Sequence, residues 1–160
     1  MKRSALLTAV LLALLLAGGL LARPAAATPR AAAAPSSWSR TWAGNAALNW
    51  AEGNATGHPY VWAGAGPYGY DCSGLVMAAF AHGAHIALPH STYAMLASPR
   101  LHRIPVAGAP RGALMFFGSG HVELNTVWYH TTFGAHHSGT TVGWRSWNSY
   151  YAPTMAFLAY

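Results

Sequence analysis

The chain contains one cysteine, Cys72, within the short motif Asp71-Cys72-Ser73-Gly74. The apolar residues between Leu75 and Phe80 follow at helical spacing, so the motif predicts that Cys72 begins a helix with Asp71 as its N-cap. The free N–H groups at such a helix start favour a thiolate, the reactive form of cysteine. Cys72 is therefore a candidate nucleophile. The alternatives are a buried, inert thiol and an intermolecular disulfide.

A cysteine nucleophile needs a base, usually a histidine that a third polar group holds in place. His121 follows a glycine-rich turn and opens a predicted strand, and His136 ends the next one. Neighbouring antiparallel strands would bring the two together, so that His136 fixes the tautomer of His121. His137 is the alternative third residue, because adjacent strand residues face opposite ways. For Glu123, which shares the face of His121, we expect either a solvated position or a supporting one behind that histidine.

The nine histidines also raise the question of a metal site. His82 and His85 have the i, i+3 spacing of a helical ligand pair, and His136 and His137 are adjacent. However, a His-Glu-x-x-His motif is absent and the chain has only three acidic residues. We therefore predict neither a metal nor another cofactor.

The helices and strands that would position these residues can be predicted from the spacing of apolar residues and from the Gly and Pro residues that interrupt it. Residues 41–52 have the pattern of a short amphipathic helix, the segment after Asp71 that of a second helix ending near Gly83, and residues 91–97 that of a third. Strands are predicted at 113–117, 121–129, 131–135, 140–144 and 155–160. Helices followed by strands indicate an α+β fold with an antiparallel sheet.

The N-terminus has the pattern of an export signal over residues 1–27, with a short basic start, an apolar run and a small-residue cleavage site. An uncleaved anchor is the alternative, although the apolar run is short for a membrane span. Residues 28–40 are rich in Ala and Pro and are expected to form a linker before one domain at 41–160. Beyond the signal, six scattered arginines and three acids give a net charge of +3. This pattern does not favour nucleic-acid binding, and we expect a secreted monomer.

Taken in order, five motifs resemble those of the NlpC/P60 cysteine peptidases, over roughly residues 42–145. They are Pro59-Tyr60-Val61-Trp62, Asp71-Cys72-Ser73-Gly74-Leu75-Val76, Leu88-Pro89-His90-Ser91-Thr92, Arg111-Gly112-Ala113-Leu114-Met115-Phe116-Phe117 and His121-Val122-Glu123-Leu124. The resemblance implies a papain-like α+β fold, with N-terminal helices packed on a central antiparallel sheet. It also implies that Cys72 is the nucleophile, His121 the base and His136 the third polar residue.

The same resemblance implies a substrate. Members of this family typically hydrolyse peptidoglycan stem peptides, most often between γ-D-glutamate and a diamino acid. Tyr60 would line the site, and Asp71 and Ser73 would contact the amine end of the stem peptide. Departures from the family pattern at Ala63, Ala113 and Glu123 leave two other functions open. One is a non-catalytic binding module with the same fold, and the other is an amidase or acyltransferase that acts on a different amide or ester.

Overall fold

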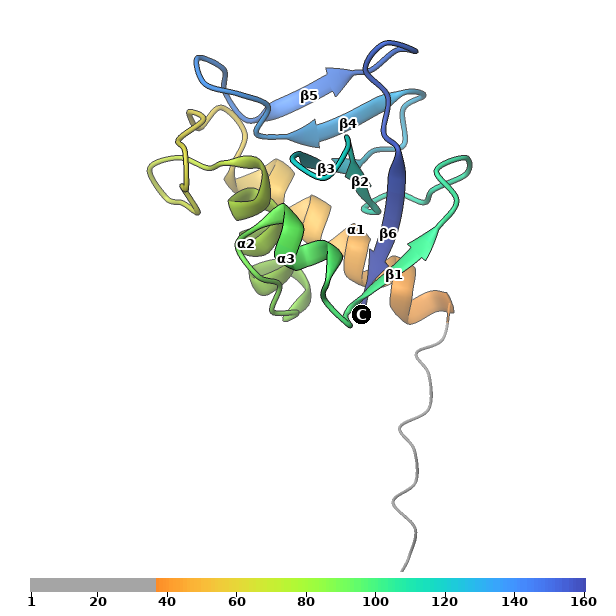
Figure 1. Ribbon diagram of the computed structural model, residues 1–160. Coiled ribbons are helices and arrows are strands. Elements are labelled where there is room, and N and C mark those ends of the chain that lie inside the picture. The colour runs from red at the N-terminus through yellow and green to blue at the C-terminus, as the bar shows by residue number, and fades with distance from the viewer. Residues whose placement is uncertain (1–36) are drawn as a thin grey trace, which may run out of the picture. The chain divides into compact units, whose positions relative to one another are not determined.

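The computed structural model describes residues 37–160. The expected signal at 1–27 and most of the expected linker at 28–40 lie outside the described residues. Three helices come first, α1 (Ser37–Asn54), α2 (Cys72–Ala84) and α3 (Thr92–Leu96) (Figure 1). Six strands follow: β1 (Leu101–Ile104), β2 (Leu114–Phe116), β3 (Val122–Asn125), β4 (Thr131–Gly134), β5 (Gly143–Ser146) and β6 (Met155–Ala159). Within this part of the chain, none of the helices has the length and hydropathy that a membrane span requires.

Helix α1 is longer than its sequence pattern predicts, because it begins at Ser37, inside the expected linker, and ends at Asn54. Its buried face consists of small residues and one leucine, at Ala43, Ala47, Leu48 and Ala51. Small side chains let a neighbouring helix approach closely. A Cβ on Gly83 of α2 would lie only 2.5 Å from the carbonyl oxygen of Ala46. Gly83 is therefore a contact point between the two helices.

Helix α2 begins where the sequence indicates, with Cys72 as its first residue and Asp71 as N-cap. The Asp71 side chain accepts a hydrogen bond of 2.6 Å from the backbone N–H of Gly74. The helix ends at Ala84, one residue after Gly83, as the sequence predicts, but the left-handed C-cap is His85 with φ 56° and not a glycine. Gly83 serves the close packing of α2 against α1 and not the turn that ends α2.

The strands form one antiparallel sheet in the order β1-β6-β2-β3-β4-β5. Helices α1 and α2 lie together on one side of it, as Figure 1 shows. The expected α+β class with a central antiparallel sheet is therefore confirmed. Strand β1 had no counterpart among the predicted strands, and β5 lies about three residues later than predicted. Both strands are at the edges of the sheet and are partly exposed, so their apolar pattern is weak.

The main core fills the space between the helices and the sheet, with Phe80 from α2 and Phe116 and Phe133 from the sheet among its largest buried side chains. Because β3 lies in the interior of the sheet, between β2 and β4, its side chains are buried on both faces of the sheet. Any polar side chain of β3 must therefore find partners inside the protein.

Candidate active site

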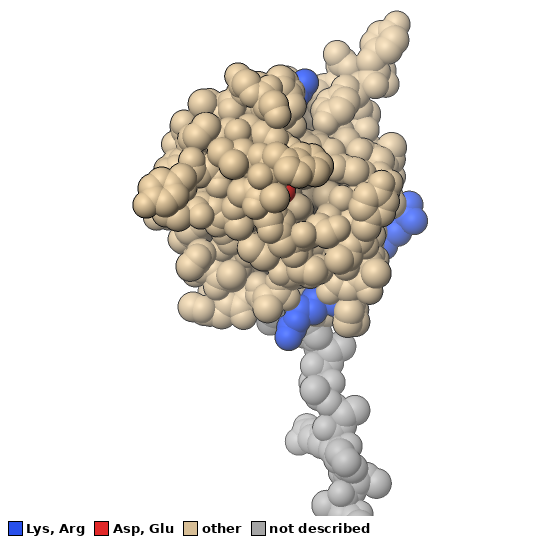
Figure 2. All heavy atoms as spheres, turned by 60° about the vertical axis from the view of Figure 1, so that its left-hand side comes forward, with Lys and Arg blue, Asp and Glu red and all other residues tan. Residues whose placement is uncertain are grey.

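Cys72 lies at the floor of a cleft of about 400 Å³ that the start of α2 shares with the 59–70 loop, the 90–93 segment and His121. The loop is held against the helix start by a backbone hydrogen bond of 2.8 Å from Asp71 N–H to the Gly64 carbonyl. A Cβ on Gly74 would overlap the same carbonyl, so this position requires glycine. Figure 2 shows the corresponding face, where arginines lie at the margins and one small acidic patch lies in a hollow near the centre.

His121 precedes β3 and contacts both Cys72 and Glu123. Its Nε2 lies 2.7 Å from Glu123 Oε1, which leaves the other ring nitrogen for the thiol. Burial by itself lowers the pKa of His121, but the hydrogen bonds with Cys72 and Glu123, together with the charge of Glu123, raise it to about 9. The structure thus brings together the nucleophile and base expected from the sequence, with the imidazole held in its protonated form at neutral pH.

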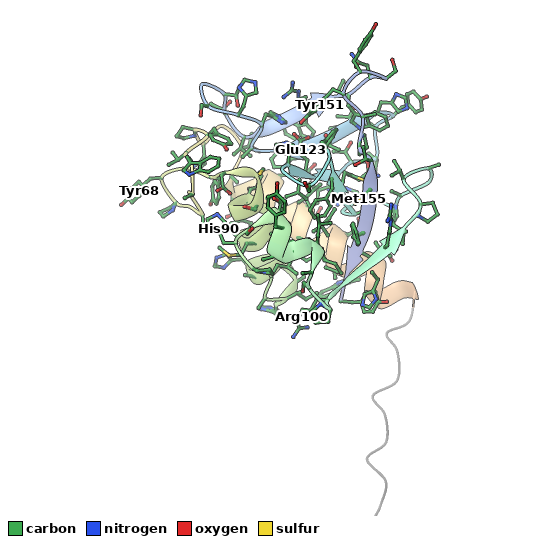
Figure 3. The ribbon with its side chains drawn as sticks, in the orientation of Figure 1. Tyr68, His90, Arg100, Glu123, Tyr151 and Met155 are labelled. Carbon is green, nitrogen blue, oxygen red and sulfur yellow. The ribbon has the colours of Figure 1, made fainter. Side chains whose placement is uncertain are left out.

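Glu123 is the fully buried centre of the polar network (Figure 3), with an exposed fraction of 0%. Besides His121, it accepts hydrogen bonds from His136 Nδ1 at 2.6 Å and from the Thr132 hydroxyl. Burial alone raises the pKa of Glu123, but its hydrogen bonds with His121 and His136 and the charge of His136 lower it to about 2. The alternative that Glu123 is solvated is therefore wrong, and it supports His121 from behind.

His136 does not occupy the place that the sequence pattern suggested for it. We expected it to bind His121 directly, whereas in the structure it hydrogen-bonds Glu123, and Glu123 contacts His121. The reason is the length of the glutamate side chain, which reaches the space between the two imidazoles from β3. The rival residue, His137, is exposed and bonds the Ser138 carbonyl. Of the two, only His136 therefore joins the network.

Gly134 is a functional position that sequence reasoning missed. The register of β3 and β4 pairs Leu124 with Phe133, so Gly134 lies opposite Glu123. A Cβ on Gly134 would lie 2.5 Å from Glu123 Cγ and 3.0 Å from Cδ. The glutamate thus occupies the space that any side chain on β4 would take. The sequence could have indicated this position only through the register of β3 with β4. Predicting that register requires the exact length of the hairpin between the two strands.

The predicted substrate-binding residues also line the cleft. Tyr60, Asp71 and Ser73 all border it, next to His90. The Ser73 hydroxyl lies 3.1 Å from Asp71 Oδ1, and His90 Nε2 lies 3.0 and 3.1 Å from the two Asp71 oxygens. Burial, and then the negative charges of Cys72 and Asp71, raise the pKa of Tyr60. Asp71 therefore has partners on three sides, and His90, to which the sequence assigned no role, is one of them.

Aromatic side chains form the rim. Trp62 and Tyr93 line the cleft and are exposed, while Tyr68 extends away from the protein at the tip of its loop (Figure 3). Tyr151 stacks on Phe117 beside His121. Because the rings of Trp62 and Tyr93 are accessible and line the cleft, they can cover a substrate chain that lies over Cys72.

The three groups His121, Glu123 and His136 also have the composition of a metal site, with their ligand atoms within 4.8 Å of one another. However, the nitrogen–oxygen distances of 2.6 and 2.7 Å are those of charge-assisted hydrogen bonds. The opposite pKa shifts of His121 and Glu123 match an ion pair. We interpret the cluster as a hydrogen-bonded network that orients His121.

Known proteins are similar to this chain in sequence and in fold. Over 80 residues the chain is 40% identical to the peptidoglycan endopeptidase RipA of Mycobacterium tuberculosis, which is 48% of this chain and 16% of that protein. Over 39 residues it is 64% identical to a probable endopeptidase of the same species, which is 24% of this chain and 10% of that protein. The chain therefore spans only about a tenth of the first curated relatives that it matches.

Solved structures agree over a longer stretch. The peptidoglycan hydrolase RipB from Mycobacterium tuberculosis superposes with a TM-score of 0.64 at 27% identity, covering 79% of this chain and 70% of that one. The NlpC/p60 domain of the peptidoglycan hydrolase SagA gives a TM-score of 0.61 at 28% identity, covering 71% of this chain and 96% of that one. Residues 57–158 match the NlpC/P60 family, which is more than half of the sequence. This chain belongs to the NlpC/P60 family.

Proposed function

We propose that the chain is a secreted thiol endopeptidase that hydrolyses an amide bond in peptidoglycan stem peptides. One observation carries the proposal: Cys72 at the start of α2 contacts His121, which is itself paired with a buried carboxylate. A nucleophile, a base and an orienting acid in series are the parts that acyl transfer from an amide requires. RipA, RipB and SagA, all described as acting on peptidoglycan, support the substrate class.

In the first step, the Cys72 thiolate forms a bond to the scissile carbonyl carbon. The N-cap carboxylate of Asp71 and its carbonyl already accept from the N–H groups of Gly74 and Leu75. The N–H groups of Cys72 and Ser73 are therefore the candidates to stabilise the oxyanion. The positive end of α2 favours the negative charge on both sulfur and oxygen.

In the second step, the imidazolium of His121 donates its proton to the leaving amine as the carbon–nitrogen bond breaks. Water then attacks the thioester, gives a proton back to His121 and releases the acid and the thiolate. Glu123 keeps one His121 nitrogen occupied, so the other faces Cys72. His136 and Thr132 hold Glu123 in the ionised state that this role needs. The working group in this proposal is thus Cys72, His121 and Glu123, with His136 as a positioning residue.

The same residue types have been altered in a relative. Structures of RipA mutated at a cysteine, at a histidine and at a glutamate superpose on this chain with a TM-score of 0.65 and identities of 25–27%. The altered cysteine and histidine of that relative are 49 residues apart, as Cys72 and His121 are, and this supports the pairing of these two residues. The altered glutamate lies 12 residues after the histidine, so it does not match the position of Glu123, which lies two residues after His121. For the bond, we propose the link between γ-D-glutamate and the diamino acid, with Asp71, Ser73 and Tyr60 contacting the stem peptide.

Digestion of purified stem peptides by the full chain and by Cys72→Ala, followed by mass spectrometry, tests the proposal. We expect the native chain to release a fragment cut after γ-D-glutamate and Cys72→Ala to lose at least a thousandfold of the rate. A product fragment of a different mass would show that the chain hydrolyses another amide bond of the stem peptide. Equal product from both proteins, or from neither, would contradict hydrolysis by Cys72 and favour a binding module.

A further inference from the structure

A second and larger cleft, of about 680 Å³, lies away from Cys72. It is enclosed by the 106–109 turn, the 125–130 turn between β3 and β4, and Trp147, which follows β5. His121 and His136 lie at the other ends of β3 and β4. Since β3 has four residues, roughly 13 Å of strand separates the two sites. Figure 1 shows the loop after β1 and the turn between β3 and β4 on the side opposite the start of α2.

Stacked aromatic rings build the wall of this cleft. Tyr129 stacks on His130 with ring centroids 3.7 Å apart, and His130 stacks on Trp147 at 3.9 Å. The backbone N–H of Trp147 bonds the His130 carbonyl at 2.9 Å, which fixes the stack to the end of β5. Trp128 stands beside them, 55% exposed and edge-on to Trp144. The stack is therefore held in place with His130 covered on both faces, while the side chains of Trp128 and Tyr129 stay exposed.

One polar atom of the cleft residues has no partner. Trp147 Nε1 is buried and has no hydrogen-bond partner, the only such side-chain atom in the part of the chain that the structure describes. A buried donor without an acceptor carries a desolvation cost. Because Trp147 Nε1 has almost no exposed surface, a ligand in the cleft reaches it only if the indole ring moves. Among the described residues that line the cleft there is no Asp, Glu, Lys or Arg. The site thus offers the exposed rings of Trp128 and Tyr129 and a buried, unpaired indole N–H, but no fixed charge.

This chemistry fits a sugar ring. A pyranose presents an apolar C–H face, which stacks on aromatic rings, and an edge of hydroxyl or acetamido acceptors for donors such as an indole N–H. A charged peptide would find no counter-charge here. An extended peptide would need a free strand edge, whereas β3 and β4 are paired on both sides.

We propose that the 106–109 turn, the 125–130 turn and Trp147 form a binding subsite for an N-acetylated saccharide. That this saccharide is the glycan strand of peptidoglycan rests on the proposed function. Stem peptides branch from such strands. A glycan held roughly 13 Å from the catalytic residues would keep the enzyme on the polymer while a stem peptide enters the Cys72 cleft.

Calorimetric titration of the full chain with triacetylchitotriose tests the subsite. We expect binding to the native chain, at least tenfold weaker binding to Trp128→Ala, and about fivefold weaker binding to Trp147→Phe, which replaces the indole by a smaller phenyl ring and removes the N–H. The matched control is Trp42→Ala, because Trp42 is similarly exposed at 49% but lies on α1 outside the cleft. Its affinity should equal that of the native chain.

Three results would overturn the subsite: no binding of the trisaccharide to the native chain, equal loss in Trp42→Ala, or full displacement by a sugar-free stem peptide. Activity separates this proposal from the catalytic one. Trp128→Ala should cut a sugar-free stem peptide at the native rate and release less product from intact wall, whereas Cys72→Ala should fail on both and still bind the trisaccharide. Loss of hydrolysis of the free peptide in Trp128→Ala would also count against the subsite.

Discussion

The two ends of strands β3 to β5 differ in the kind of side chain that they carry and in how those side chains are held. At one end, His121, Glu123 and His136 bury their polar atoms in direct contact with one another. At the other end, the rings of Trp128, Tyr129 and Trp147 face a wide cleft and use few hydrogen bonds. The polar end depends on bond lengths and charge state, because a buried charge is costly unless it is fully paired. The aromatic end depends on surface area, which tolerates small shifts. We therefore expect substitutions at the polar end to have the larger effects.

Among the substitutions that test this comparison, the largest effect should come from Glu123→Ala, which leaves two buried imidazoles without their shared acceptor. We expect kcat/KM on stem peptides to fall by about 10²–10³-fold and the free energy of unfolding to fall by about 3 kcal/mol. Urea titration and steady-state kinetics measure both quantities. Glu123→Gln is the matched variant, since it keeps the shape and an acceptor oxygen and should retain more of the stability. If Glu123→Ala kept native activity, the polar end would not position His121.

Gly134→Ala tests whether the space for Glu123 matters. The new methyl group would lie 2.5 Å from Glu123 Cγ, so the carboxylate must move. We expect a loss of about 1–3 kcal/mol in stability and at least tenfold in kcat/KM. Gly143 is the control, because it pairs with Gly134 in the sheet and a Cβ there would meet nothing within 4 Å. Equal effects of Gly134→Ala and Gly143→Ala would show that sheet geometry, not the glutamate, is responsible.

His136→Asn should have a smaller effect, because His121 keeps its contact with Glu123. Loss of one donor makes Glu123 less firmly ionised, so the pKa of His121 should fall. We expect a decrease of about threefold to tenfold in kcat/KM at neutral pH, and an alkaline limb of the pH profile that begins below the pH 9 expected for the native chain. His137→Asn, which changes an exposed histidine, should leave the profile unchanged. A shifted limb in His137→Asn instead would reverse the assignment.

The free energy of unfolding should depend on pH through the ionisation of His121 and Glu123. The raised pKa of His121 contributes stability that is complete below its usual 6.5 and is lost as pH rises through about 9. The lowered pKa of Glu123 contributes stability that is complete above its usual 4.5 and is lost as pH falls through about 2. Urea unfolding should therefore show a maximum from pH 4.5 to 6.5. Glu123→Gln should abolish most of the alkaline decline. Glu52→Gln should keep it, because Glu52 is a half-buried glutamate that pairs with Arg111 and takes no part in the network of His121.

The smallest effect is expected at the aromatic end. Tyr129 is 87% exposed, so Tyr129→Ala should change the free energy of unfolding by less than about 0.5 kcal/mol. Thermal and urea unfolding check this value. A loss comparable to that of Gly134→Ala would mean that the ring stack is part of the folded core, and the contrast between the two ends would fail.

The sequence by itself determined the place of Cys72, the proposed nucleophile, and the fold class. Asp71 before an apolar helical pattern placed Cys72 at a helix start, because capping and periodicity are local properties. Motif order gave the family, and His121 followed from a strand start. Helix ends were less certain, since Gly83 has the residue type of a C-cap but serves packing against Ala46.

Only the tertiary structure decided which group supports His121. Glu123 and His136 are thirteen residues apart, and their meeting depends on the register of β3 with β4 and on the absence of a side chain at Gly134. Burial then decided between the two positions expected for Glu123, solvated or behind His121, in favour of the second. Register and burial are set by contacts between distant segments, and a one-residue slip would move every side chain to the other face. For that reason the local pattern identified the candidate residues, while the sheet determined how they contact one another.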